Sequence, residues 1–128
     1  FVAAHPERLV TVEEAATAYD ISRTHLMKVA NLLVRQDFLK GVRGRAGGLM
    51  LARAPAEISL GRLIRATEPA FATVECFGEA EGRSALRGDR WRRILSDAME
   101  VFLGELDRYS LTDLLADPER FGLARQPA

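Results

Sequence analysis

The stretch Gly41–Leu51, GVRGRAGGLML, decides the fold prediction for this chain. It holds four glycines and two arginines, and it ends in an apolar segment. We expect residues 38–42 and 49–52 to form two short strands with RGRAGG as their hairpin connection, because glycine readily adopts the positive φ values of such turns. A phosphate-binding loop should instead open a helix and carry Lys-Ser or Lys-Thr after its glycines, whereas the glycines here precede the apolar segment LML, which disfavours a nucleotide phosphate site. A hairpin without any ligand stays open as an alternative.

Two helices are predicted before this hairpin. Thr11 and Glu14 have the spacing of a capping box, which indicates that the segment TVEEAATAYD forms a short helix. Asp20 tolerates the left-handed backbone of a tight turn, and Ser22 is a suitable cap for a second helix, RTHLMKVANLLVRQ. Two helices joined by a tight turn and followed by a basic hairpin predict a winged helix-turn-helix.

The second half of the chain is predicted to be helical on both sides of one irregular segment. Ser59 is expected to cap a short helix that Pro69 ends, and residues 71–88 show no clear period. From about residue 89 to residue 108, apolar residues recur at spacings of three and four, which predicts a long helix with a one-sided apolar stripe. The predicted fold class is therefore mainly α (α+β), with a two-stranded wing and a long C-terminal dimerisation helix.

The net charge of the 128 residues is zero, but the charges are unevenly distributed. Residues 22–65 hold nine Lys and Arg residues against two acids, whereas residues 66–128 hold eight against twelve. A basic block inside a neutral protein creates a local positive field, which favours an anionic partner. A solvated charged face is the alternative that this pattern alone leaves open. No apolar run approaches the roughly 20 residues of a membrane span.

The predicted motif brings polar and basic residues to two places that suit duplex DNA. The first turns of the second helix, the part of a recognition helix that meets base edges, carry Arg23, Thr24, His25 and Lys28. Arg43 and Arg45 are two residues apart in the hairpin, so extended backbone would direct both to the same side. No Ser/His/Asp or paired-carboxylate arrangement suggests catalysis, and we do not expect an enzyme. The alternative function is a protein-interaction module that keeps the winged-helix fold, which the basic block disfavours.

The segment Ser22–Pro69, SRTHLMKVANLLVRQDFLKGVRGRAGGLMLARAPAEISLGRLIRATEP, resembles the DNA-binding half of the NsrR/IscR-type winged-helix repressors of bacteria. Its S-R-x-H-x-x-K helix, V-R-G-x-x-G-G wing and I-x-x-G-x-x-x-R-x-x-E-P segment follow the order of that family. The later segment AMEVFLGELDRYSLTDLL resembles the family's long dimerisation helix, most of all that of the nitric-oxide-sensing NsrR branch. The resemblance covers the chain to about residue 116.

This resemblance implies a homodimeric repressor that grips a pseudo-palindromic operator and responds to nitric oxide, iron or redox state. It implies a recognition helix that contains Ser22, Arg23, Thr24, His25 and Lys28, and a wing that contains Arg43 and Arg45. The expected parts are a winged-helix domain with a truncated first helix (1–69), a sensor loop (70–88), and a dimerisation helix with a C-terminal tail (89–128). A single cysteine suggests a reducing compartment, so we expect a cytoplasmic protein.

The cysteine count departs from the family pattern. Family members that sense through an iron–sulfur cluster carry three cysteines before the long helix, whereas this chain has one, Cys76, which matches the first. The third position falls on Asp89 without gaps or on Ser84 with a gap, and the second falls among residues 78–82, where no cysteine stands. Thiolates are the usual cluster ligands, so the expected ligand set is incomplete. An inert Cys76 and a redox-reactive one both stay open. Acidic side chains offer a weaker oxygen ligand set: Glu79, Glu81 and Asp89.

Overall fold

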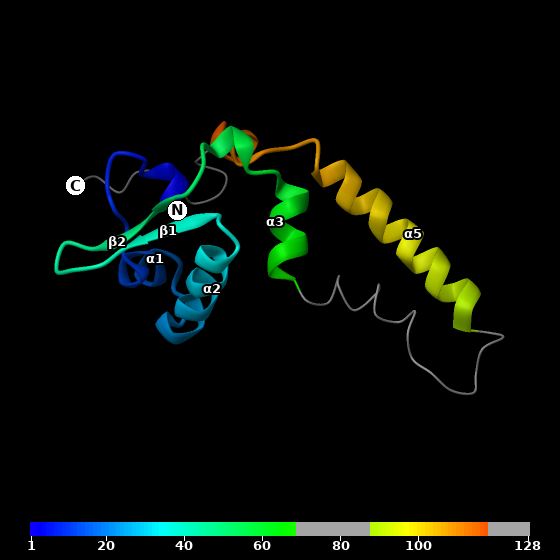
Figure 1. Cartoon of the computed structure of the whole chain (residues 1–128), viewed down its shortest axis with the longest axis horizontal. Coiled ribbons are helices and arrows are strands. Elements are labelled where there is room, and N and C mark those ends of the chain that lie inside the picture. The colour runs from blue at the N-terminus through cyan, green and yellow to red at the C-terminus, as the bar shows by residue number, and fades with distance from the viewer. Residues whose placement is uncertain (69–87, 118–128) are drawn as a thin grey trace. The chain divides into compact units, whose positions relative to one another are not determined.

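The computed structural model describes residues 1–68 and 88–117 (Figure 1). Its contacts divide the chain into two compact units, one formed by Phe1–Ile58 with Ser110–Ala128 and the other by Ser59–Tyr109. The predicted irregular segment, residues 71–88, lies outside the described residues except for Gly88, where a helix begins. The functional division of the chain at residues 69 and 88 stays a prediction.

The helix-turn-helix lies in the first unit and consists of α1, Val12–Tyr19, and α2, Arg23–Arg35. The Thr11 hydroxyl accepts the Glu14 N–H, and the Glu14 carboxylate accepts the Thr11 N–H, which confirms the predicted capping box. Asp20 has the left-handed φ of 53° that the tight turn needs, and Ser22 caps α2 as predicted. The local sequence signals thus set both helix starts and the turn between them.

The beginning of the chain forms a single helical turn. Val2–Ala4 forms one 3-10 turn, η1, in which the His5 N–H donates to the Val2 carbonyl at 3.1 Å. Pro6 follows directly, and the residue before a proline is disfavoured in helical backbone. The turn therefore ends at this point of the chain.

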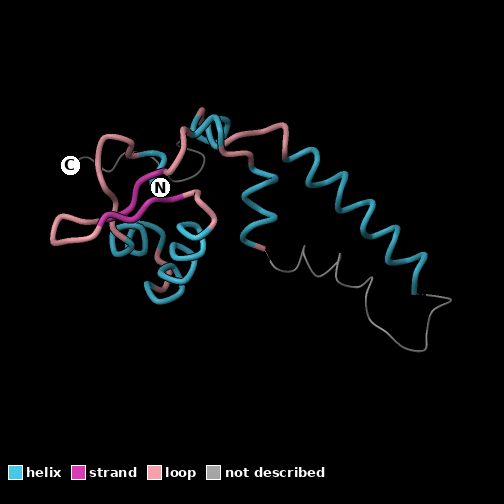
Figure 2. The backbone as a smooth tube through the Cα atoms, in the orientation of Figure 1, coloured by secondary structure: helices cyan, strands magenta, loops and turns pink. Residues whose placement is uncertain are grey.

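The wing consists of β1, Leu39–Val42, and β2, Gly48–Leu51, with the wing tip, residues 43–47, between them. The strands are antiparallel and lie within one residue of the predicted ranges (Figure 2). Leu49 also pairs on its other side with Val10, through N–O distances of 3.0 Å and 2.7 Å. The segment before α1 therefore adds a single bridge to the sheet, and the wing is bonded to the start of the helix-turn-helix.

The core of the first unit lies between the helices and the wing. Val10, Phe38 and Leu39 are buried, together with Ala16 of α1 and Ala30 of α2. The helix α2 contacts both α1 and β1, and Figure 1 shows the two helices beneath the hairpin. The small side chains of both helices let the backbones approach this core closely. Two short elements complete the unit: η2, Pro55–Glu57, and α6, Leu111–Leu115.

The second unit contains α3, Leu60–Thr67, and α5, Gly88–Leu106. The Ser59 hydroxyl accepts the Arg62 N–H at 3.2 Å, which confirms the predicted cap of α3. The long α5 confirms the predicted C-terminal helix. Together with the two-stranded sheet and the other helices of the described residues, it confirms the mainly α fold class with a wing.

The two helices of the second unit cross at Gly61. A Cβ atom at this position would lie 2.6 Å from the Leu103 carbonyl oxygen and 2.3 Å from Asp107 Oδ1. The same Asp107 carboxylate accepts from the Ser59 hydroxyl at 3.0 Å and from Arg65 at 2.8 Å. These donors hold the pKa of Asp107 below its ordinary value, the Arg65 hydrogen bond being the largest cause. Only glycine fits this crossing without a shift of the neighbouring helix.

Candidate nucleic-acid interface

The N-terminal end of α2 presents the five predicted residues to solvent. Each of them is exposed: Ser22, Arg23, Thr24, His25 and Lys28. The Ser22 hydroxyl accepts the backbone N–H of His25 at 3.4 Å, so this side chain belongs to the cap of α2. The first turn of a helix also carries unpaired N–H groups and a partial positive charge, which favour a phosphate nearby. The end of α2 therefore offers both polar side chains and a positive field.

An acidic side chain also reaches this end of α2. Arg23 Nε lies 2.7 Å from Glu13 Oε2, and Glu13 belongs to the first turn of α1. No sequence signal predicts this ion pair, since its two residues lie in different helices and are ten positions apart. Its position follows only from the turn that brings the two helix starts together.

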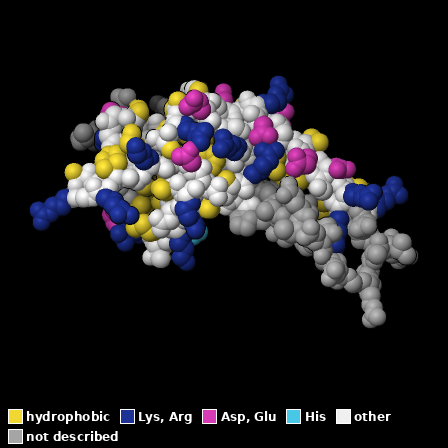
Figure 3. All heavy atoms as spheres, in the orientation of Figure 1, with side chains coloured by type: hydrophobic (Ala, Val, Ile, Leu, Met, Phe, Trp, Pro, Cys, Tyr) yellow, Lys and Arg dark blue, Asp and Glu magenta, His cyan; other side chains and the backbone are white. Residues whose placement is uncertain are grey.

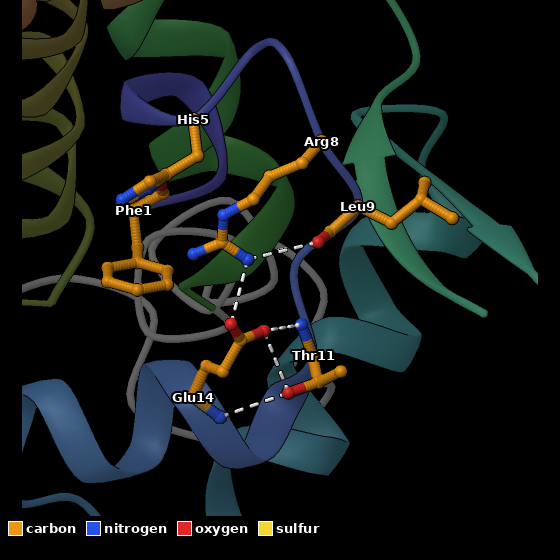
Figure 4. Close-up of polar contacts among 6 residues, drawn as sticks. All are labelled: Phe1, His5, Arg8, Leu9, Thr11 and Glu14. Atoms are coloured by element: carbon orange, nitrogen blue, oxygen red, sulfur yellow. Dashed lines mark hydrogen bonds and ion pairs between the residues drawn. The ribbon is translucent and has the colours of Figure 1, made fainter. Parts of the chain in front are cut away.

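The start of α1 is itself fixed by a small polar network (Figure 4). The Glu14 carboxylate accepts the Thr11 N–H at 2.7 Å and the Thr11 hydroxyl at 3.0 Å, and it pairs with Arg8 at 2.7 Å. These donors hold the pKa of Glu14 below its ordinary value, and the backbone hydrogen bond from Thr11 is the largest cause. The carboxylate therefore stays ionised at neutral pH and keeps the first turn of α1 in place.

The wing tip has a shape that two of its glycines require. Gly44 has a φ of 116°, a conformation that residues with a side chain rarely adopt. A Cβ atom at Gly47 would lie 2.3 Å from the Val42 carbonyl oxygen, while the Gly47 N–H donates to the Gly44 carbonyl at 3.0 Å. Arg43 and Arg45 are exposed on either side of Gly44. They lie in the turn and not on extended backbone, so strand alternation does not set their directions, contrary to the prediction.

Further basic side chains accompany these predicted DNA-binding residues. Figure 3 shows Lys and Arg side chains over this unit, including one that projects at the end of the hairpin. Lys40 is exposed on β1, next to the buried Leu39, and was not singled out from the sequence. Its place in the basic block of residues 22–65 is the signal that could have identified it. Arg53 is engaged elsewhere, in an ion pair with Asp37.

The second unit carries an exposed apolar stripe along α5. Its members are large and partly or largely exposed: Trp91 (62%), Ile94 (50%), Leu95 (39%), Val101 (74%) and Phe102 (50%). The helix turns a different side to α3, where Leu103 is buried. Exposed apolar residues that gather on one side of a helix mark an interaction surface, since water is a poor solvent for them.

The described residues do not supply a ligand set for an iron–sulfur cluster. Over residues 1–68 and 88–117, His, Cys, Asp and Glu form no group of three or more that could hold a metal ion. Cys76, the one predicted ligand, lies outside this part of the chain and is the single cysteine of the sequence. One thiolate per chain does not match a cluster held by three.

A family model for Rrf2, described as an iron-dependent transcriptional regulator, matches residues 1–117. The chain belongs to the Rrf2 family of transcriptional regulators. The HTH-type transcriptional regulator NsrR of Geobacillus kaustophilus is 40% identical over 113 residues, which cover 87% of this chain and 76% of the relative. NsrR of Bacillus subtilis is 35% identical over 121 residues, with 93% and 83% covered. These matches confirm the predicted resemblance and make the chain a DNA-binding transcriptional regulator.

Solved structures agree with the winged-helix fold. IscR of T. potens has a TM-score of 0.63 at 28% identity, covering 97% of this chain and 82% of that structure. CymR, the global cysteine regulator of B. subtilis, has a TM-score of 0.67 at 22% identity, covering 90% of this chain and 84% of its own. Within residues 1–68 and 88–117, no helix combines the length and apolar character that crossing a bilayer requires.

Proposed function

We propose that this regulator is a homodimeric repressor that grips a pseudo-palindromic operator with two winged helices. The observation that carries the proposal is the combination, within one unit, of an exposed polar end of α2 and a basic wing tip whose shape two glycines fix. The α2 helix enters the major groove, and the wing lies on the sugar–phosphate backbone or in the adjacent minor groove.

The two elements have different tasks in this proposal. Arg23, Thr24 and His25 contact base edges, because the first turn of a recognition helix is the part that reaches them. Arg43 and Arg45 hold phosphates, which position the protein without reading the sequence. Ser22 caps the helix, and Lys28 lies one turn further along α2 as an additional exposed cation.

The proposed dimer forms through the apolar stripe of α5. Val101 and Trp91 are the most exposed members of this stripe, and both would be removed from water by the same helix of a second chain. A symmetric pair of α5 helices would also fix the spacing of the two recognition helices, as a two-fold operator requires.

A salt titration of DNA binding tests the proposal. A dimer that neutralises some six to ten phosphates should lose about a thousandfold or more in affinity between 50 and 200 mM salt. The probe is a promoter fragment from upstream of the protein's own gene, with binding followed by fluorescence anisotropy. A protein-interaction module would bind no such fragment, or would bind it without this salt dependence, and either result would refute the proposal.

The signal is proposed to be nitric oxide, iron or redox state, acting on the part of the chain that contains Cys76. No step is assigned to a cluster, because the described residues do not provide one with ligands. The proposed site of action is the cytoplasm, where a bacterial regulator meets its DNA.

A further inference from the structure

An ion pair with Arg23 brings the carboxylate of Glu13 to the end of α2 that is proposed to meet DNA. Arg23 Nε lies 2.7 Å from Glu13 Oε2, and the side chains are 60% and 68% exposed. A surface that only had to attract phosphates would gain nothing from a carboxylate there. We infer that Glu13 is a positioning residue for Arg23 and a determinant of operator specificity, an inference that rests on the proposed function.

The backbone at both ends of this ion pair is held independently of it. On the Glu13 side, the Thr11–Glu14 capping box and the Arg8 ion pair fix the first turn of α1 (Figure 4). On the Arg23 side, the Ser22 cap fixes the first turn of α2. The ion pair therefore joins two defined positions. It restricts the long side chain of Arg23 and leaves the two helices as they are.

The atom that Arg23 uses decides what remains for DNA. The closest contact of this ion pair is between Nε and Glu13 Oε2, at 2.7 Å, so the two terminal NH2 groups of the guanidinium remain for another partner. Two parallel N–H donors at the far edge of the guanidinium suit the O6 and N7 acceptors of guanine. Arg23 thus keeps a complete bidentate edge while its rotation is limited, and less conformational entropy is lost when the base contact forms.

The carboxylate also distinguishes correct from incorrect duplexes. On an incorrect sequence the protein is held almost entirely by phosphates, and there the positive charge of Arg23 is already balanced by Glu13. The phosphates repel the carboxylate, which lowers the affinity further. On the correct sequence the guanine hydrogen bonds offset this cost. Glu13 should therefore weaken binding to incorrect DNA more than binding to the operator.

A purely structural role for this ion pair predicts something different. Pairs this exposed contribute little to folding stability, because water and salt screen them. Thermal unfolding of a Glu13→Gln variant should therefore match that of the wild type. Any change in base preference would then come from the free charge and orientation of Arg23 and not from a smaller amount of folded protein.

The test uses the full chain and two duplexes: the one that the wild-type protein enriches from a random pool, and a shuffled duplex of the same composition. We expect Glu13→Gln to lower the ratio of the two affinities about tenfold, mainly through tighter binding to the shuffled duplex. The salt slope on the shuffled duplex should steepen by about one unit. In an Arg23→Ala background the same change should leave the affinity ratio unaltered, because the two residues act as one unit. Glu7→Gln, which removes the same charge from an exposed position of the same unit, is the matched control.

Three results would overturn the inference while leaving the proposed function intact. The first is a Glu13→Gln protein whose ratio of affinities for the two duplexes equals that of the wild type. The second is a Glu13→Gln effect on this ratio that is the same in the wild-type and Arg23→Ala backgrounds. The third is an effect of Glu7→Gln on the ratio as large as that of Glu13→Gln. Each would show that the carboxylate does not act through Arg23. A wild-type protein that binds both duplexes equally, or neither, would instead refute the proposed function, and the inference with it.

Discussion

Replacing Gly47 with alanine tests whether the shape of the wing tip is needed for DNA binding. The added Cβ would lie 2.3 Å from the Val42 carbonyl oxygen, about 1 Å short of ordinary van der Waals separation. That oxygen belongs to the backbone of β1, so the tip must move as a whole. The movement also disturbs the 3.0 Å hydrogen bond from the Gly47 N–H to the Gly44 carbonyl.

The expected cost follows from these two effects. Overpacking of this kind costs about 1–3 kcal/mol and a broken hydrogen bond costs about 1 kcal/mol, so the native tip is destabilised by about 2–4 kcal/mol. The apparent Kd equals the intrinsic Kd divided by the fraction of molecules whose wing tip keeps the binding shape. A destabilisation of about 2 kcal/mol lowers this fraction, and therefore raises the apparent Kd, by about 30-fold. The loss of binding free energy cannot exceed the amount that the wing itself contributes to DNA binding. The strain is local, so the unfolding temperature should change much less than the affinity.

Gly41→Ala is the matched control, because a Cβ atom there meets nothing within 4 Å and Gly41 has no positive φ. This variant should bind as the wild type does, and it should be as stable or slightly more stable. The assay is fluorescence anisotropy over a salt series, with circular dichroism for unfolding. A displaced tip should reduce the salt slope by about one unit for each phosphate that the protein no longer neutralises. Wild-type affinity and slope in Gly47→Ala would refute the idea that this backbone shape is needed.

Further predictions concern recognition, assembly, pH and iron. Arg45→Ala should weaken binding to all duplexes alike, whereas Arg23→Ala should cost about 1–3 kcal/mol on the operator and relax base preference; swapped phenotypes would show that the docking is wrong. Val101→Glu places a charge on the apolar stripe of α5 and should give monomers in sedimentation. Gly104→Glu, at an open position of the same helix, should leave the dimer intact, and a monomeric wild type would contradict the proposed interface. The pKa of Glu14 is lowered in the folded protein, so its carboxylate stabilises the fold fully above the pKa of the unfolded chain, and this stabilisation is lost as the pH falls through the pKa of the folded protein. Glu14→Gln should therefore be less stable than the wild type at neutral pH and approach the wild-type stability in acid, as measured by unfolding in urea. Protein purified without oxygen should lack the visible absorption of a cluster held by three thiolates, and brown protein with stoichiometric iron would disprove this.

Local signals in the sequence predicted most of the first unit. The Thr11–Glu14 capping box is formed, Ser22 caps α2, and Asp20 adopts its predicted left-handed backbone. Each depends on residues at most three positions apart, so the chemistry is visible in a short segment. Such signals also set the wing, since its glycines have strong local preferences.

Interactions between distant segments could not be predicted in this way. The bridge from Val10 to Leu49 involves a single residue and leaves no alternating pattern to detect. The close helix crossing at Gly61 depends on Asp107, far along the chain, and one glycine in a short helix does not indicate it. The Glu13–Arg23 ion pair is likewise a product of the turn geometry. These features need the folded backbone before any side chain can be placed.

The bridge between Val10 and Leu49 separates two properties of a DNA-binding protein that could otherwise change together, the bases that it prefers and the length of its footprint. The N–H and C=O of Leu49 both bond to Val10, two residues before α1, while Leu49 lies opposite Gly41 of β1 in the sheet, so the distance between wing and helix-turn-helix is set by peptide groups. These bonds are made by main-chain atoms alone. In the proposed docking, the outward residues of α2 can therefore diverge, and with them the preferred bases, while the footprint of one protomer on the duplex keeps its length. In this docking, single substitutions on α2 would change the preferred operator sequence, whereas a new footprint length would require an insertion or a deletion.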